Sequence, residues 1–547
     1  MRGLVFTYIM LCCCVFLSAA SPGFAGSALW ISDELPQWYK KGGITSSGEK
    51  AIEILKSSET NGIASSRYDI ENLSTYLTLK TEDEAEISNI NDQITQKLVL
   101  YMIDLESGIG RSRENIKKLS DEGERKSVLQ AISRLIRQPD YNVMLDNIQT
   151  DNEQYIKLKK ALSAYTALKN SQLIKTIALK TPLELGDEHE AIPQIRQNIK
   201  IINAAAKSTK FDKIKLEPGI EYDEALMDEV QQFQKITRLE ADGVLNKRTV
   251  ERMNNYADDG IAQIRFTMDK LRSETPRGGQ KYIVVNVPEF QLYAYSAGKR
   301  EFTMPIIVGQ VGTQTPEFRN GINTVVLNPD WRPTAKITRE LVAKIRRNPE
   351  FLAKEGYEVA WFDGEKIDSD LYQDIDWNEI QASDIKIRQQ AGGQNALGHI
   401  KFLMPNSNDI YLHDTNSRKL FAKTDRALSH GCIRLGDPMK LAEFVLGREV
   451  FEKRNITKKA GKGGSEYINI TSIPVYAIYH TAWVDDDGFI NIAADIYNKS
   501  KKFNQALQGD ADELNKLLAE TLPDSPRPNR AGVHMDEIAT NINPATP

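Results

Sequence analysis

The feature that most constrains the fold of this chain is a change in the period of its apolar residues near Pro276. Before this point, apolar residues recur every three or four positions, as between Tyr155 and Leu168, which is typical of helices buried on one face. After it, apolar and polar residues alternate, as between Tyr282 and Val287, which is typical of strands. We therefore predict a multidomain α+β protein with helical domains first and a mainly β domain after them.

The length of 547 residues allows about three or four domains at roughly 150 residues each. Hydrophobic residues make up 41% and charged residues 27% of the chain. This composition is globular and excludes collagen-like, wholly disordered and polytopic membrane proteins. The net charge of −5 provides no broad positive surface, so we expect no nucleic-acid partner.

The first 25 residues have the layout of a secretory signal peptide. Arg2 precedes an uncharged stretch from Leu4 to Ala20, and Gly23 and Ala25 suit a cleavage site for small residues. The alternative is an uncleaved membrane anchor, because the stretch is near the lower limit for spanning a bilayer. We predict an exported protein, associated with the membrane if the signal stays attached.

The four cysteines fall into two groups by their position in the chain. Of the four cysteines, Cys12, Cys13 and Cys14 lie in the predicted signal, and the lack of a small residue just before Cys12 disfavours a lipoprotein. After cleavage Cys432 would remain alone, without a partner for an internal disulfide. A lone cysteine is usually a small buried apolar residue, so its neighbours must decide whether it is reactive.

The pattern along the chain predicts five regions. They are a signal peptide at 1–25, a helical scaffold domain at 26–185, a three-helix module at 186–258, a mainly β domain at 259–480 with a charged helical insert at 334–395, and a C-terminal extension with a flexible tail at 481–547. The first helical domain is either simple scaffolding or a platform for a substrate or partner. The insert is either a lid or a subdomain without a role in activity.

Eight segments of the β domain have the alternation or β-branched content of strands. They are 282–287, 291–295, 302–308, 324–327, 399–404, 410–413, 467–470 and 475–479.

Cys432 lies in the run Ser429-His430-Gly431-Cys432-Ile433-Arg434, and His413 ends an earlier predicted strand. A thiol with an ordinary pKa of about 8.5 needs a nearby histidine or positive charge to act as a nucleophile at neutral pH. An imidazole can take the thiol proton and later protonate a leaving amine. Together these residues favour nucleophilic acyl transfer.

The neighbours of Cys432 suit the same chemistry. Gly431 would let a substrate approach the backbone closely, and N–H groups near Gly431 and Cys432 could form an oxyanion hole. Arg434 could pair with a substrate carboxylate or hold the loop. Asp437 and Pro438 then predict the start of a helix.

His413, fifteen intervening residues and the run from Ser429 to Arg434 closely resemble the signature of bacterial L,D-transpeptidases, the YkuD catalytic domain. Other segments share this likeness: Val308-Gly309, Thr315-Pro316, Asn328 to Trp331, Asn395 to Gly398 and Lys401-Phe402. Within 186–258, the residues from Val230 to Gln234 and the turn at Asp242-Gly243 resemble a peptidoglycan-binding module. With the helical N-terminal region and Asp495-Ile496-Tyr497, the chain resembles the long Gram-negative subgroup of the family.

The resemblance implies cysteine-dependent cross-linking of peptidoglycan in the periplasm. Cys432 would attack a tetrapeptide stem, release its terminal D-Ala and pass the thioester to the side-chain amine of a diaminopimelate on a second stem. His413 would be the proton donor and acceptor, and His430 would shape the loop. The remaining oxyanion or substrate-binding residues would be Gly431, Ser429, Arg434, Tyr411 and His430.

The same resemblance implies no cofactor and no metal, and acylation by carbapenems. The implied partners are peptidoglycan tetrapeptide stems as donor and acceptor, and other wall-synthesis enzymes. We expect a monomer. The balance of cross-linking, D-Ala trimming and attachment of proteins to the wall stays open.

Three alternative functions differ in class. A zinc hydrolase would use His399, His413, His430 and Cys432 as ligands, but their spacing lacks the usual short pairs. A papain-like endopeptidase would place its cysteine before its histidine, whereas here His413 precedes Cys432. A non-enzymatic wall-binding protein would need neither residue.

Overall fold

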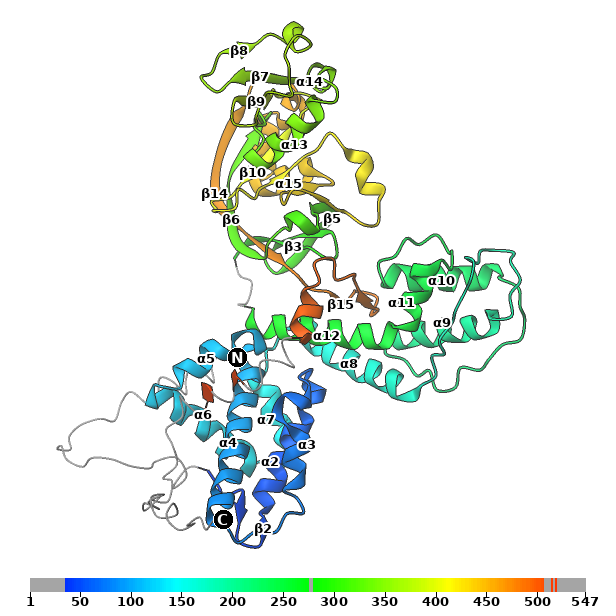
Figure 1. Cartoon of the computed structure of the whole chain (residues 1–547), viewed down its shortest axis with the longest axis vertical. Coiled ribbons are helices and arrows are strands. Elements are labelled where there is room, and N and C mark those ends of the chain that lie inside the picture. Colours follow the sequence, from blue (N-terminus) through cyan, green and yellow to red (C-terminus); the bar gives the residue numbers. More distant parts are fainter. Residues whose placement is uncertain (1–34, 275–278, 506–512, 515–516, 519–547) are drawn as a thin grey trace, which may run out of the picture. The chain divides into compact units, whose positions relative to one another are not determined.

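The computed structural model describes residues 35–274, 279–505, 513–514 and 517–518 (Figure 1). Its contacts divide the chain into two compact units. The first comprises the described parts of 1–172, 257–274 and 500–547, and the second comprises those of 173–256 and 275–499. The predicted signal peptide and most of the predicted tail lie outside the described residues. No helix in the described part of the chain is long and apolar enough to cross a membrane.

The first unit is almost entirely helical, as predicted for the N-terminal region. Its α-helices are α2 (Ser46–Lys56), α3 (Ile70–Thr75), α4 (Glu84–Ser107), α5 (Ser112–Lys118), α6 (Glu122–Arg137), α7 (Tyr141–Ile148), α8 (Glu153–Ser171) and most of α12 (Tyr256–Ser273). Short 3-10 helices lie at Ser57–Asn61, Ser65–Tyr68 and Ile109–Arg111, and strands β1 (Tyr39–Lys40) and β2 (Gly43–Ile44) form a small hairpin.

Side-chain caps and apolar faces explain these helices. Asp83 begins α4 by accepting hydrogen bonds from the N–H groups of Ala85 and Glu86. The buried residues of α4, such as Leu98, then form the centre of the hydrophobic core of this unit. That core also contains Leu514 and Leu518, from near the far end of the chain.

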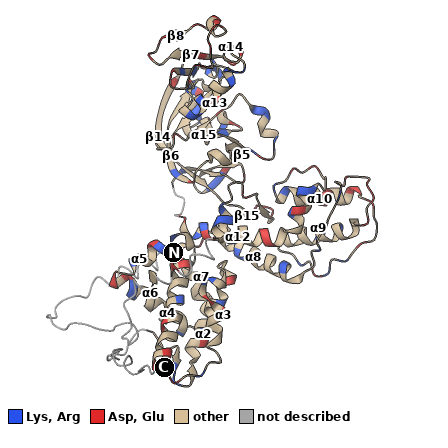
Figure 2. Cartoon of the chain, viewed as in Figure 1, with Lys and Arg blue, Asp and Glu red and all other residues tan. Residues whose placement is uncertain are grey.

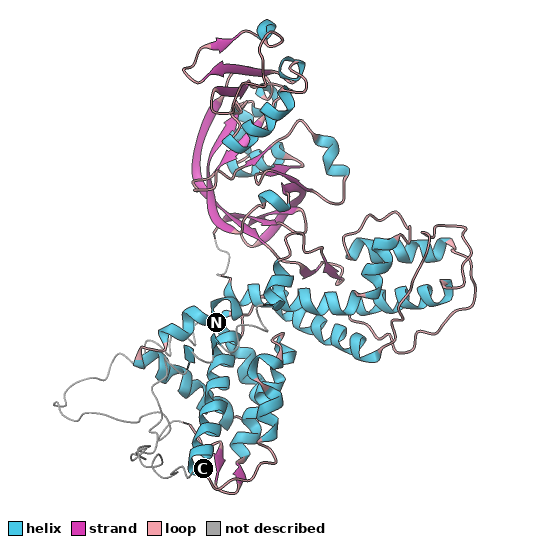
Figure 3. Ribbon diagram, in the orientation of Figure 1, coloured by secondary structure: helices cyan, strands magenta, loops and turns pink. Residues whose placement is uncertain are grey.

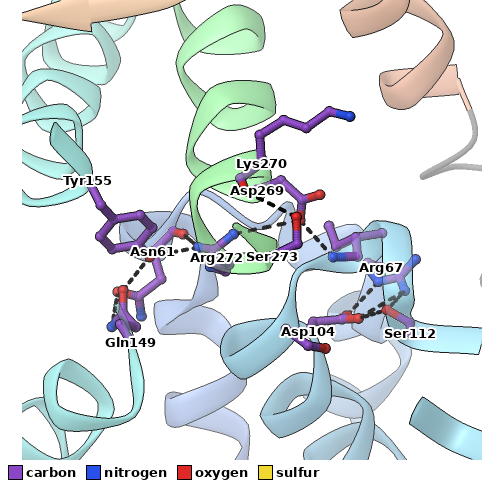
Figure 4. A network of polar contacts seen from close by, with 12 residues as sticks. Asn61, Arg67, Asp104, Ser112, Gln149, Tyr155, Asp269, Lys270, Arg272 and Ser273 are labelled. Atoms are coloured by element: carbon purple, nitrogen blue, oxygen red, sulfur yellow. Dashed lines mark hydrogen bonds and ion pairs between the residues drawn. The ribbon is translucent and has the colours of Figure 1, made fainter. Parts of the chain in front are cut away.

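A polar network is buried inside this helical core (Figure 4). Arg67 Nε donates to Asp104 Oδ2 at 2.6 Å, and the hydroxyl groups of Tyr68 and Ser112 also donate to Asp104. Arg67 and Asp104 expose 1% and 0% of their side chains. Arg272 of α12 donates to the Tyr155 hydroxyl at 2.8 Å, which joins α12 to the same unit.

Asp104→Asn is expected to destabilise the first unit by about 3–5 kcal/mol, because it leaves the buried Arg67 guanidinium without a carboxylate. Urea unfolding of the full chain, followed by circular dichroism, measures this change. The control is Asp146→Asn, which removes the exposed partner of Lys159 and should cost less than about 1 kcal/mol. Equal unfolding midpoints for the two variants would contradict the importance of the buried pair.

The second unit begins with a compact helical module. It contains α9 (Ile192–Ala206), α10 (Glu224–Ile236) and α11 (Lys247–Asn254). Gly243 adopts a φ of +75°, as the predicted turn requires. The predicted helix after this turn is α11, and it is capped by the Asn246 side chain, which accepts the Thr249 N–H at 3.0 Å.

The rest of the second unit is built around a sheet of nine strands (Figure 3). The strand order is β12-β5-β13-β11-β10-β6-β14-β3-β4, and β4 also pairs with β5, so the sheet closes on itself. The strands are β3 (Lys281–Asn286), β4 (Gln291–Ser296), β5 (Lys299–Gly309), β6 (Phe318–Leu327), β10 (Ile400–Leu403), β11 (Leu412–His413), β12 (Ala427–Ser429), β13 (Ile433–Leu435) and β14 (Glu466–Ile478).

Short helices and a hairpin complete this part. The helices are α15 (Pro438–Leu446), α16 (Arg448–Lys453) and α17 (Ile456–Lys459), with 3-10 helices at Val311–Thr313 and Arg418–Ala422, and the hairpin strands are β15 (Ala482–Val484) and β16 (Ile490–Ile492). Asp437 caps α15 by accepting the Lys440 N–H at 3.0 Å, with Pro438 in the first turn, as predicted.

The structure corrects the prediction in several places. Four strands, β12, β13, β15 and β16, coincide with none of the predicted segments. The segments 467–470 and 475–479 belong to one long strand, β14, which continues through an irregularity between Asn469 and Ile473. The insert is not purely helical. It contains α13 (Ala335–Ile345), α14 (Glu350–Lys354) and a 3-10 helix (Ser369–Leu371), and also a sheet of β7 (Tyr357–Trp361), β8 (Lys366–Ile367) and β9 (Ile385–Gln389).

The insert is stabilised by a hydrophobic core of its own. Leu341 and Ile345 of α13 pack with Val359 of β7, Ile387 of β9 and the buried Trp377. The sheet forms because β7 and β9 place alternate residues in this core. In both units, the positions of Lys and Arg are interspersed with those of Asp and Glu along the ribbon (Figure 2).

Candidate active site

The candidate site lies on three neighbouring strands, β10, β11 and β13. Parallel pairing of β11 with β13 sets Leu412 beside Ile433 and His413 beside Arg434, and antiparallel pairing sets Lys401 beside His413. Leu412 and Ile433 are fully buried in the core of the sheet. Because side chains alternate along a strand, His413, Arg434 and Lys401 share the opposite face.

Tyr411 and Cys432 precede Leu412 and Ile433, and the same alternation brings them to this face. The Ile433 N–H donates to the Tyr411 carbonyl at 3.1 Å. The Cys432 thiol lies 3.5 Å from the Asp409 carbonyl and also hydrogen bonds with Tyr411. The fold thus gathers four of the sequence-predicted site residues on one surface: Tyr411, His413, Cys432 and Arg434.

The environment keeps both reactive groups neutral. Although the Cys432 side chain is partly exposed, the surrounding protein desolvates it and raises its pKa to about 11, against the lowering effect of hydrogen bonds from Tyr411 and the charge of Arg434. Burial and the charges of Arg434 and Lys401 lower the pKa of His413 to about 3. At neutral pH a thiol therefore accompanies a neutral imidazole.

A backbone carbonyl selects the tautomer of His413. The Nδ1 atom lies 2.5 Å from the Asp414 carbonyl oxygen. Because a carbonyl only accepts, Nδ1 carries the proton and Nε2 keeps its lone pair. Asp414 is itself fixed, since its carboxylate accepts the N–H groups of His399 and Thr415 and a hydrogen bond from Arg418. In neutral His413, Nε2 is therefore the ring nitrogen that is able to accept a proton.

Hydrogen bonds close the loop that carries Cys432. The Ser429 hydroxyl accepts the Gly431 N–H at 3.1 Å and donates to the Cys432 carbonyl at 2.6 Å. Gly431 has a φ of +118°, a conformation that favours glycine. The Gly431 N–H, one of the two predicted oxyanion donors, is thus already engaged by Ser429. In the described part of the chain, no acceptor is found for the Cys432 N–H.

The insert contacts the site at two points. His430 Nε2 lies 2.7 Å from Glu340 Oε2 of α13, so His430 joins the loop to the insert. Trp331 exchanges backbone hydrogen bonds with Gln389 of β9, and its indole hydrogen bonds with the Tyr411 hydroxyl. Glu340 and Trp331 were not predicted as site residues.

Two cations, Lys401 and Arg434, lie next to the thiol. Burial lowers the pKa of both Lys401 and Arg434, and Arg434 Nε is buried without a hydrogen-bond partner. Lys401, which the sequence did not single out as a site residue, faces the Tyr411 ring at 5.6 Å from its centroid. Such positive charge favours a thiolate, an oxyanion or a substrate carboxylate at this place.

The residues of the zinc alternative do not converge. Among the described residues, no group of three or more His, Cys, Asp and Glu side chains is placed to hold a metal ion. Two of the proposed ligands have other partners, since His413 binds the Asp414 carbonyl and His430 binds Glu340.

Comparison with known proteins agrees with this geometry. Residues 280–468 match the L,D-transpeptidase catalytic domain (YkuD), and residues 32–162 match the Scaffold domain. The chain is 40% identical over 298 residues to the Probable L,D-transpeptidase YcfS of Escherichia coli (strain K12), which covers 53% of this chain and 75% of that protein. This chain belongs to the L,D-transpeptidase family. The family resemblance seen in the sequence is confirmed.

A second L,D-transpeptidase relative is matched over a shorter part. The Putative L,D-transpeptidase of Haemophilus influenzae is 34% identical over 226 residues, which is 41% of this chain. The chain spans 45% of the length of that relative. The crystal structure of Mycobacterium tuberculosis L,D-transpeptidase 1 is 15% identical and covers 37% of this chain and 62% of that one, and its TM-score of 0.16 is too low to support any argument.

The reactivity of the cysteine in this L,D-transpeptidase is expected to depend steeply on pH. Because only the thiolate reacts and the pKa of Cys432 is raised to about 11, alkylation by iodoacetamide should become about tenfold faster per pH unit from about 7 to 10. Mass spectrometry of the intact protein at fixed times measures the rate. A plateau below about pH 8 would indicate a thiolate–imidazolium pair and contradict the neutral pair.

Proposed function

We propose that this protein is a cysteine-dependent L,D-transpeptidase that cross-links peptidoglycan stem peptides. One observation carries the proposal: Cys432, directly before β13, lies on the same face as His413 of the neighbouring strand β11, and His413 presents an unprotonated Nε2. A thiol beside an oriented neutral imidazole is the arrangement that nucleophilic acyl transfer needs.

In the acylation step, Cys432 Sγ attacks the carbonyl carbon of the L,D peptide bond of a tetrapeptide stem, and its proton passes to His413 Nε2. The carbonyl oxygen becomes an oxyanion, to which the Cys432 N–H, without an acceptor among the described residues, would donate. When the intermediate collapses, the C–N bond breaks, and His413 returns the proton to the leaving amine of D-Ala. The product is a thioester on Cys432.

In the transfer step, the side-chain amine of a diaminopimelate on a second stem attacks the thioester. His413 removes a proton from this amine and returns it to the sulfur as the C–S bond breaks. Arg434 and Lys401 lower the pKa of His413, so they disfavour a long-lived imidazolium and favour rapid return of the proton. Both cations would also attract the carboxylates of the stem peptide.

The proposed location, peptidoglycan-binding module and partners follow from the sequence. The predicted signal peptide supports a periplasmic location, and the module at 186–258 would bind peptidoglycan near the catalytic domain. The insert at 334–395 would act as a lid, because Glu340 already contacts the loop of Cys432 through His430. The proposed partners are tetrapeptide stems and other wall-synthesis enzymes, and carbapenems would acylate Cys432.

The test is incubation of the full chain with a purified disaccharide-tetrapeptide, followed by mass spectrometry. A dimer that has lost one alanine supports cross-linking, whereas a monomer that has lost one alanine supports D-Ala trimming. Parallel reactions contain a chelator or iodoacetamide. Loss of activity with the chelator but not with iodoacetamide would support the zinc alternative, and an unchanged muropeptide would contradict the proposal.

A further inference from the structure

The peptide group between Gly431 and Cys432 is held from one side. Thr315 Oγ1 donates a hydrogen bond to the Gly431 carbonyl oxygen at 2.7 Å. In a planar trans peptide, the C=O and the following N–H point in opposite directions. Binding of the Gly431 carbonyl by Thr315 therefore aims the Cys432 N–H away from Thr315, where no acceptor is found among the described residues.

Thr315 is itself held by hydrogen bonds with Gly309 and Tyr497. Its hydroxyl oxygen accepts the Gly309 N–H at 2.9 Å, and its own N–H donates to the Tyr497 hydroxyl at 3.2 Å. The Tyr497 hydroxyl donates to the Gly309 carbonyl at 2.5 Å. Thr315 is fully buried and Tyr497 is 2% exposed, so water does not compete for these groups.

Tyr497 comes from outside the matched catalytic domain, which ends at residue 468. It is anchored by Tyr479, whose hydroxyl accepts the Tyr497 N–H at 2.8 Å and donates to Asp495 at the same distance. The rings of Tyr479 and Tyr497 stack with centroids 5.5 Å apart. The segment around Tyr497 is thus anchored by the Tyr479 hydroxyl and binds Thr315 through the Tyr497 hydroxyl. Thr315 in turn binds the loop that carries Cys432.

We propose that Thr315 and Tyr497 are positioning residues that aim the Cys432 N–H at the oxyanion of the tetrahedral intermediate. The inference rests on the proposed acyl transfer. Each hydrogen bond has a defined direction: the Thr315 proton holds Gly431, and the Tyr497 proton holds Gly309. Without the Thr315 hydroxyl, the Gly431 carbonyl would lose this hydrogen bond, and the Cys432 N–H would be held less firmly in its orientation.

Two reactions of Cys432 separate this role from simple support of the fold. Acylation by a carbapenem passes through an oxyanion, whereas alkylation by iodoacetamide displaces iodide at a saturated carbon and forms none. Thr315→Val keeps the shape of the side chain and removes the hydroxyl. We expect carbapenem acylation and cross-linking kcat to fall about tenfold to a hundredfold, with KM and the alkylation rate unchanged within about twofold.

Matched variants keep the inference falsifiable. Thr315→Ser retains the hydroxyl and is expected to acylate at nearly the wild-type rate. Tyr497→Phe removes the second hydroxyl and should lower acylation about tenfold while alkylation stays constant. The control for this variant is Tyr467→Phe, because Tyr467 is 64% exposed on β14.

The outcomes distinguish failure of the positioning role from failure of the proposed acyl transfer. If both Thr315→Val and Tyr497→Phe acylate at the wild-type rate, the positioning role is wrong while acyl transfer stands. If acylation and alkylation fall equally, the hydroxyl groups support the loop as a whole, and the role is again wrong. If the wild-type protein neither cross-links nor forms a carbapenem adduct, the proposed function itself fails.

Discussion

Cys432→Ala is expected to abolish both cross-link formation and the carbapenem adduct, with a loss of at least about 10³-fold. No other described side chain near the site offers a nucleophile oriented beside a neutral imidazole, so the thioester cannot form. The readout is the cross-linked dimer made from disaccharide-tetrapeptide, quantified by mass spectrometry. The fold should survive, because Cys432 makes no disulfide and its side chain is partly exposed.

The same variant separates an enzyme from a wall-binding protein. Binding to purified peptidoglycan sacculi should be unchanged in Cys432→Ala, because the helical module at 186–258 is untouched. Loss of cross-linking with retained binding supports the proposed function. Cross-linking by Cys432→Ala at the wild-type rate would falsify it.

His413→Asn is expected to lower kcat about 10²–10⁴-fold, because it removes the base and the proton donor of both steps. Asparagine can still donate a hydrogen bond to the Asp414 carbonyl in place of Nδ1, so the local structure should be kept. The KM for the donor stem should change little. Steady-state cross-linking by the full chain measures both constants.

His399→Asn is the matched control for this substitution. His399 was a ligand in the zinc alternative, but its side chain is not placed with Cys432 or His413 in any group able to hold a metal among the described residues. Its cross-linking rate should stay near wild type. A loss as large as that of His413→Asn would contradict the cysteine–histidine mechanism and favour a metal site.

The buried state of His413 also predicts how stability changes with pH. Its folded pKa of about 3 lies below the ordinary value of about 6.5, so the unfolded chain binds the extra proton between these values. This contribution to stability is complete above about pH 6.5 and is lost as the pH falls toward 3. The drop in Tm between pH 7 and pH 4.5 should therefore be smaller for His413→Asn than for wild type.

The sequence singled out Cys432 and His413 because both residues stand in one recognisable pattern, and their roles remain predictions. Tyr411 and Arg434 were predicted from their places beside His413 and Cys432 and from the family resemblance, and the pairing of β11 with β13 brings them to the same face. Asp414 could not be found, because it contributes a main-chain carbonyl that any residue carries. Glu340 could not be found either, since an insert of its own fold brings it to His430.

Fold prediction succeeded where periodicity was strong and failed where it was weak. The helical character before Pro276 was predicted correctly, and the predicted segments after it fall on seven of the fourteen described strands, β3, β4, β5, β6, β10, β11 and β14. β14 was divided in two because Thr471, Ser472 and Pro474 read as a turn, although the strand continues past its irregularity. The sheet of the insert was missed because the charged segment was interpreted as helical throughout, although β9 alternates buried Ile385 and Ile387 with Lys386 and Arg388.

The presence of Leu514 and Leu518 in the first core has a consequence for the order of folding. A core that combines residues 38–145 with Leu514 and Leu518 cannot be completed until these two leucines have been synthesised. The helices of the first unit therefore cannot complete their core before that point. The closed sheet of the second unit does not depend on these two leucines. Contacts so distant in sequence also slow the search for the native state. We expect the helices that contribute residues 38–145 to this core to become rigid late in folding.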